Sequence, residues 1–298
     1  LHHSRAFYIK PVRVMPWVTM KESSPVTDGQ RYNRSNYLLG IYAVTEREIL
    51  KFFRQRERLL SPIVRPSLRL LIFASGLQNL LGISIIEPYQ TYTPYQEYIL
   101  PGLAGIIVLF QCMQAALSLV YDREAGVMRV MLVSPLPRHF LLFARIFGAT
   151  LLAVLQVYFF LGLAAVFGFY MPLMGMIFII PAILAAGIML GSIGLLITVY
   201  TRQIENFAGM MNFVIFPMFF MSSALYPLWK LRESGADILF WLAQFNPFTH
   251  AVELIRFAAY GQFNTLSAAV VLTCSAIAFL LAARGYNPNS GAIARIKR

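Results

Sequence analysis

The feature that most limits how this chain can fold is a series of long apolar stretches that carry almost no charge. Since a helix rises about 1.5 Å per residue, stretches of this length can cross the roughly 30 Å hydrocarbon core of a bilayer. The sequence therefore predicts an all-α integral membrane protein with six transmembrane helices. They are expected near residues 65–85, 98–120, 140–169, 175–200, 207–225 and 266–283.

Composition excludes a water-soluble globule. Of the 298 residues, 58% are hydrophobic and 13% are charged, whereas soluble domains carry about 25% charged residues. The charges gather in four regions: 1–69, 121–145, 229–256 and the end of the chain. The net charge of +12 fits contact with anionic lipid headgroups better than it fits nucleic acid, so we expect membrane lipid as a partner and no nucleic acid.

The distribution of Lys and Arg predicts the orientation. With the six spans above, 22 of the 25 basic residues fall on one side of the membrane and 3 on the other. Basic residues accumulate in cytoplasmic loops. Both termini are therefore expected in the cytoplasm.

The region before the first span is expected to have two parts. Residues 1–36 are polar, basic and interrupted by prolines, which predicts a flexible cytoplasmic arm outside the single transmembrane domain of 37–298. Residues 37–60 place basic side chains on one helical face and apolar ones on another. This pattern predicts an amphipathic helix along the inner leaflet, serving as a lipid anchor alone or also contacting a cytoplasmic partner.

Between the fifth and sixth spans, residues 226–265 differ from an ordinary loop. The run 238–245 is apolar but too short to span, Asn246-Pro247 interrupts it, and 248–260 forms a second short helical run. We expect two short re-entrant helices on the outer side. Glu253 and Arg256 are three residues apart on one face and are expected to pair, since a lone charge at that depth is costly.

Polar side chains inside the predicted spans are few. They are expected either to form hydrogen bonds between helices or to line a path for an amphipathic molecule. The candidates for lining a path or a dimer interface are Gln111, Gln114, Asn212, Pro217, Phe219 and Phe220. The predicted spans carry no acid at mid-depth, which argues against a proton- or sodium-coupled carrier. Gly187 and Gly191 form a G-x-x-x-G pair, which predicts close helix packing.

The connection between the second and third spans, residues 121–138, is the most informative segment. Asp122, Arg123 and Glu124 begin it, a short helical run follows, and Pro135 and Pro137 fix its exit. On the residues alone it is either a solvated turn carrying a topology signal or a rigid element that transmits force to both spans.

Three segments resemble the type-2 ABC-transporter permease family, in order and on the expected topology. The first matches a D-R-E-x-G-x-M-x-x-x-x-V-[ST]-P-L pattern at Asp122, Arg123, Glu124, Gly126, Met128, Val133, Ser134, Pro135 and Leu136. The second lies in the fifth span, at Asn212, Phe216-Pro217, Phe219-Phe220, Ser222 and Tyr226-Pro227. The third is Asn246-Pro247-Phe248-Thr249, followed by Arg256.

The resemblance implies the permease subunit of an ABC exporter in a bacterial plasma (inner) membrane, moving a lipid-linked or amphipathic substrate outward. It implies a second permease copy, in a homodimer, and two copies of a separate ATPase subunit that binds ATP and Mg. This chain lacks a G-x-x-x-x-G-K-[ST] phosphate loop, so it is expected to bind no cofactor and to hydrolyse no ATP itself. The implied ATPase-coupling residues are Asp122, Arg123, Glu124, Gly126, Met128, Arg129, Pro135, Pro137 and Arg138.

Two other classes are weaker. A membrane-embedded enzyme needs a nucleophile–base set or a metal site, and His139 near Ser134 has no carboxylate in the local sequence to complete one. No catalytic or metal-ligating residue is therefore assigned, and Cys112 and Cys274 are expected to be packing residues. A non-transporting membrane anchor is the third possibility.

Overall fold

The computed structural model describes residues 34–54, 95–125, 136–201 and 204–285, together with Leu68 and Pro88. Every regular element in those ranges is a helix. Their bounds are α1 Arg34–Arg54, α3 Tyr95–Glu124, α5 Arg138–Val166, α6 Leu173–Tyr200, α7 Ile204–Phe220, α8 Leu228–Glu233, α9 Asp237–Phe245, α10 Pro247–Ala259 and α11 Thr265–Gly285. Residues 1–33 of the predicted arm, the predicted first span apart from Leu68, and residues 55–60 lie outside the described residues.

Four of the described helices, α3, α5, α6 and α11, are long and apolar enough to cross a membrane. They lie where the second, third, fourth and sixth spans are predicted, so the all-helical membrane fold is confirmed at those positions. The fifth predicted span corresponds to α7, which is apolar but has 17 residues and ends at Phe220, five residues before the predicted boundary.

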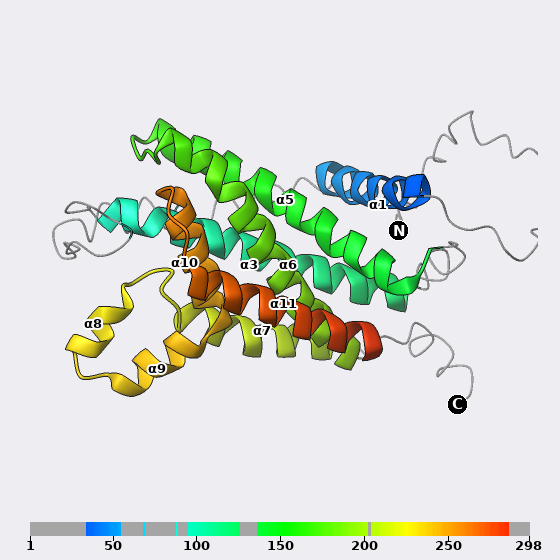
Figure 1. Cartoon of the computed structure of the whole chain (residues 1–298). Helices are drawn as coiled ribbons and strands as arrows, with labels where there is room; N and C mark the ends of the chain where they lie inside the picture. The colour runs from blue at the N-terminus through cyan, green and yellow to red at the C-terminus, as the bar shows by residue number, and fades with distance from the viewer. Residues whose placement is uncertain are drawn as a thin grey trace, which may run out of the picture.

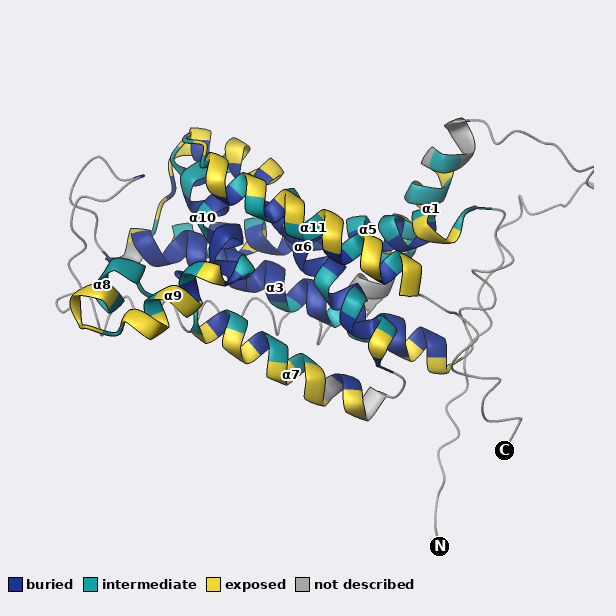
Figure 2. Cartoon of the chain, turned by 60° about the horizontal axis from the view of Figure 1, so that its bottom comes forward, coloured by how far each residue is buried: buried dark blue, intermediate teal, exposed yellow. Residues whose placement is uncertain are grey.

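The long helices run side by side, and α6 contacts α3, α5, α10 and α11 (Figure 1). One end of the bundle carries α1 and the last turns of α11, and the other carries α8 and α9; these are called the α1 end and the α9 end below. Figure 2 shows α3 buried along most of its length, whereas α5, α7 and α11 each present an exposed face. The exposed faces are rich in large apolar side chains, as expected for helices that contact lipid.

Helices α5 and α6 approach closely because α6 carries the predicted glycine pair. A Cβ at Gly187 would lie 2.4 Å from Cγ2 of Thr150, and a Cβ at Gly191 would lie 2.7 Å from Cγ2 of Ile146. Real Cβ atoms do not approach that closely, so only glycine permits this spacing. The predicted close packing at the G-x-x-x-G pair is confirmed.

The predicted amphipathic helix corresponds to α1, which packs along the first part of α5. Tyr37 meets Phe140 edge to face, with ring centroids 5.0 Å apart. A Cβ at Gly148 would lie 3.4 Å from Cα of Thr45. The two helices therefore run alongside one another in the same direction, held by small residues at their contact.

Three helices, and not two, lie between α7 and α11. The predicted runs at 238–245 and 248–260 correspond to α9 and α10, and α8 precedes them. Asn246 separates α9 from α10 and caps α10, since its side-chain oxygen accepts a hydrogen bond from the Phe248 amide at 3.0 Å. Helix α9 exposes Ile238, Trp241 and Phe245, whereas α10 is buried against α3 and α6.

Candidate functional site

The segment 121–138 joins α3 to α5 at the α1 end. Residues 121–124 form the last turn of α3, and Pro137 is the N-cap of α5, directly before Arg138. Four predicted coupling residues, Gly126, Met128, Arg129 and Pro135, lie outside the described residues. The structure therefore shows how the two ends of this connection are anchored.

Asp122 is the centre of a charge cluster formed by Arg47, Glu48, Asp122 and Arg145. The Asp122 carboxylate lies 2.5 Å from the Arg145 guanidinium and 3.6 Å from that of Arg47. Nε of Arg145 lies 3.8 Å from Glu48, and its Nη2 donates to the Ser118 hydroxyl at 3.1 Å. The cluster alternates acid and base and joins α1, α3 and α5.

Arg123 points to a different helix. It is buried, and its guanidinium donates to the carbonyl of Thr198 at 3.1 Å and to that of Thr201. These carbonyls belong to the C-terminal end of α6, where the last peptide oxygens have no partner within the helix. A cation there also complements the negative end of the helix dipole. Glu124, the next residue, is exposed.

The two buried charges at the end of α3 thus hold that end against three other helices. Asp122 connects it to α1 and α5, and Arg123 connects it to α6. Breaking a buried ion pair by removing one partner costs about 3–5 kcal/mol. The end of α3 at which segment 121–138 begins is therefore held by buried charges against α1, α5 and α6.

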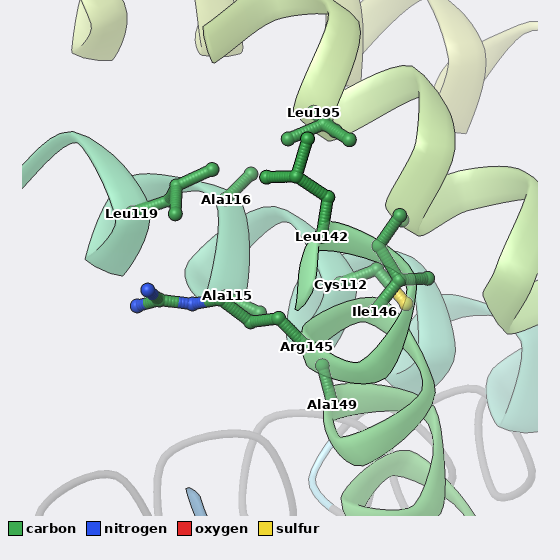
Figure 3. Close-up of a pocket in the computed structure, with 10 residues that line it drawn as sticks. Cys112, Ala115, Ala116, Leu119, Leu142, Arg145, Ile146, Ala149 and Leu195 are labelled. Atoms are coloured by element: carbon green, nitrogen blue, oxygen red, sulfur yellow. The ribbon is translucent and has the colours of Figure 1, made fainter. Parts of the chain in front are cut away.

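A small pocket lies beside the charge cluster, where α3, α5 and α6 meet (Figure 3). Its lining is mostly small and apolar, and Arg145 extends along one side. The thiol of Cys112 donates to the Gly187 carbonyl at 3.3 Å. Among the residues that the structure describes, no group of three His, Cys, Asp or Glu side chains is placed to hold a metal ion.

At the α9 end, a second buried group surrounds Arg256. Its guanidinium pairs with Glu253, as the three-residue spacing predicts, and donates to the Ser223 carbonyl at 2.7 Å. Tyr98 donates to the same carbonyl at 3.0 Å. We call Tyr98, Ser223, Glu253 and Arg256 the Arg256 cluster; it joins α3 and α10 to the segment that follows α7.

Asn246 holds the C-terminal end of α7. Its side-chain amide donates to the carbonyls of Met218 and Met221, at 2.8 Å and 2.5 Å. The same side chain caps α10 through its oxygen. One asparagine thus joins the end of one helix to the start of another, and Pro247 occupies the first position of α10, where a missing N–H costs nothing.

The candidate path residues divide by burial. Gln111 and Phe219 are buried within this chain, and Gln114 is half-buried. Asn212, Pro217 and Phe220 are exposed on α7. The exposed face of α7 is therefore the part of this set that another molecule can contact in this conformation.

Sequence reasoning assigned no coupling role to Arg145, Glu48 or Arg47. Arg145 lies inside the predicted third span, at 140–169. A charge inside an apolar span requires a partner. That requirement was the available signal, and it would have directed attention to Asp122.

A helical bundle whose described residues include four membrane-length helices and buried charges at both ends defines a multi-pass membrane protein. The model of the family described as "ABC-2 type transporter" matches residues 40–260, and the chain belongs to that family. It is accordingly the membrane permease component of an ABC-2 type transporter and not its ATPase. Family membership implies an ABC ATPase partner.

Curated relatives agree with this assignment. The chain is 29% identical over 227 residues to the "Putative transport permease ycf38" of Cyanophora paradoxa, covering 74% of each chain. It is 28% identical over 225 residues to the protein of the same name from Porphyra purpurea, covering 73% of this chain and 72% of the relative. It is also 28% identical over 102 residues to "Nodulation protein J" of Rhizobium leguminosarum bv. viciae, covering 34% of this chain and 38% of that one.

Proposed function

We propose that this chain is the permease of an ATP-driven exporter that moves a lipid-linked or amphipathic substrate outward across a bacterial plasma membrane. It spans the bilayer six times, with the α1 end in the cytoplasm and the α9 end outside. Two copies of a separate ATPase subunit bind ATP and Mg and supply the energy. The observation that carries the proposal is the attachment of the segment 121–138 to α1, α5 and α6 through Asp122 and Arg123.

In this proposal the segment 121–138 contacts the ATPase. Its two ends continue directly into α3 and α5, and the buried charges connect it to α1 and α6. Movement of an ATPase subunit against Glu124, Met128 and Arg129 is then passed to the helices as a group. Pro137 and Arg138, at the start of α5, complete the contact.

The exposed face of α7 supports the proposal that a second permease copy packs against this chain. Asn212 lies on it among Phe213, Phe216 and Phe220, which are 81%, 51% and 56% exposed. An amide facing hydrocarbon is costly, whereas the same amide against a second copy or a water-containing path is not. We therefore place the homodimer interface and the substrate path along this face.

At the α9 end, the apolar face of α9 is proposed to dip into the outer leaflet. Lys230 and Arg232 of α8 lie next to it, each over an aromatic ring, at 5.5 Å and 5.6 Å from the ring centroids of Trp229 and Phe240. Aromatic and basic side chains together are typical of a membrane–water interface.

The test is co-purification with an ATPase encoded beside the gene for this chain, followed by ATP hydrolysis measurements on the reconstituted complex. Glu124→Ala and Arg129→Ala are each expected to reduce the permease-dependent part of ATP hydrolysis. Glu233→Ala, an exposed acid at the α9 end, is the matched control and is expected to leave that rate unchanged.

Two outcomes would contradict the proposal. One is an ATPase that neither co-purifies with the permease nor responds to it. The other is a complex in which Glu124→Ala and Arg129→Ala behave as Glu233→Ala does, which would remove segment 121–138 from the contact.

A further inference from the structure

The charge cluster at the α1 end does more than neutralise buried groups. Asp122 needs one cation for that purpose, yet it lies within 4 Å of two, and the second, Arg47, comes from α1. Arg145 likewise lies near two acids, Asp122 of α3 and Glu48 of α1. Each charged residue of α3 and α5 in this cluster thus has a partner on α1.

Helices α1 and α5 also pack against each other beside this cluster. A Cβ added at Gly148 would lie 3.4 Å from Cα of Thr45 and 3.9 Å from Cβ of Glu48. On α1, a Cβ added at Gly40 would lie 2.5 Å from Cδ1 of Leu136. Gly40 also faces Phe140 of α5, whose Cε1 would lie 3.4 Å from an added Cβ. The contact between α1 and α5 therefore extends over about two turns.

We propose that α1 and the adjoining ends of α3 and α5 move as one rigid unit during the transport cycle, with Arg145 as its positioning residue. The inference rests on the proposed function, because it concerns how the segment 121–138 passes movement to the membrane helices. Arg145 contacts no substrate or nucleotide in this scheme. It fixes the position of Asp122, and hence of the segment that follows, relative to α1.

The alternative arrangement is a latch, in which the charge cluster opens in each cycle and α1 separates from α5. The structure favours the rigid unit, because the contact is both ionic and closely packed. The side chains of Arg145, Asp122 and Glu48 have relative exposures of 6%, 11% and 11%. A charge that lost its partner while still buried among these groups would be strongly destabilised. Separation of α1 would also break its packing along the first part of α5.

A disulfide between α1 and α5 distinguishes the two arrangements. The 3.9 Å between a Cβ at position 148 and Cβ of Glu48 lies within the usual range of about 3.5–4.5 Å for disulfides. The double variant Glu48→Cys/Gly148→Cys is reconstituted with the ATPase, and its permease-dependent ATP hydrolysis is measured with dithiothreitol and after oxidation by copper phenanthroline. Under reducing conditions the variant lacks the Glu48 carboxylate, while Arg145 keeps Asp122 as its partner.

We expect the reduced variant to hydrolyse ATP about fivefold more slowly than the wild-type complex, and oxidation to restore the wild-type rate. Gly148→Ala is the matched control and is expected to keep the wild-type rate in both conditions, since its Cβ makes ordinary contacts. The wild-type complex and Glu48→Cys alone show whether oxidation acts through other cysteines.

Three results would overturn the inference: a reduced variant at the wild-type rate, a rate that falls further on oxidation, or a low rate that oxidation leaves unchanged. The second of these would establish the latch. A wild-type complex without any permease-dependent hydrolysis would instead overturn the proposed function, and it would be evident before any variant is compared.

Discussion

The guanidinium of Arg256 lies 3.9 Å from the centre of the Tyr98 ring, and both residues donate to the carbonyl of Ser223. Arg256 is 2% exposed. A buried arginine that is stacked on an aromatic ring and paired with Glu253 is held from several directions. The segment after α7 is thereby fixed against both α3 and α10.

Replacing Arg256 is expected to destabilise the chain strongly. Arg256→Gln leaves the Glu253 carboxylate without this partner and is expected to lower the free energy of unfolding by about 3–5 kcal/mol. Tyr98→Phe keeps the ring under the guanidinium and removes one hydrogen bond, which is expected to cost about 1 kcal/mol. Denaturant-induced unfolding in detergent measures both effects. Arg232→Gln, exposed at the same end, serves as the control, and equal losses for Arg232→Gln and Arg256→Gln would refute the assignment.

Gly102 is expected to tolerate no side chain. A Cβ there would lie 1.9 Å from the carbonyl oxygen of Ala224, so Gly102→Ala must displace α3 or the segment after α7. We expect a loss of about 1–3 kcal/mol, seen as a lower melting temperature. Gly162→Ala is the matched control, since nothing lies within 4 Å of its Cβ. It is exposed in α5 and is expected to stabilise by about 0.5–1 kcal/mol. A Gly102→Ala variant as stable as Gly162→Ala would contradict the close contact.

Asn246→Asp separates the two roles of that side chain. Aspartate keeps the oxygen that caps α10 but removes both donors to the carbonyls of Met218 and Met221. We expect a loss of at least about 2 kcal/mol, measured by thermal unfolding. Asn264→Asp provides the comparison, because the Asn264 oxygen accepts from the Ser267 amide at 2.9 Å and aspartate retains that function. If both variants kept full stability, capping would be the sole role of Asn246.

Arg123→Lys is expected to loosen the end of α6. A single ammonium cannot reproduce the two hydrogen bonds that the guanidinium makes to Thr198 and Thr201. Hydrogen exchange of residues 193–201 is expected to accelerate about tenfold, which corresponds to about 1.4 kcal/mol. Arg284→Lys, exposed in the last turn of α11, should leave its own helix unchanged. Unaltered exchange in Arg123→Lys would show that other contacts hold α6.

The sequence predicted what depends on local pattern. The length of the apolar stretches predicted the four membrane-length helices. The three-residue spacing of Glu253 and Arg256 predicted their ion pair. Helical periodicity predicted a helix at α1. In each case the relevant partners are neighbours along the chain, so the repeat of the helix is sufficient to place them.

Long-range partners could not be predicted in the same way. Arg256 contacts Ser223, and Asp122 contacts Arg145 and Arg47, through the packing of separate helices. No local pattern specifies which helices become neighbours. Helix α8 was missed for a related reason, since its six residues are too few to show a period.

The Arg256 cluster also determines when this protein can finish folding. Tyr98 and Ser223 are 125 residues apart in sequence, and Arg256 is synthesised later still. Helix α3 is therefore synthesised before the residues that complete the contacts at its α9 end. Contacts between such distant residues form late. The α9 end of α3 can thus be fixed only after α10 has been made.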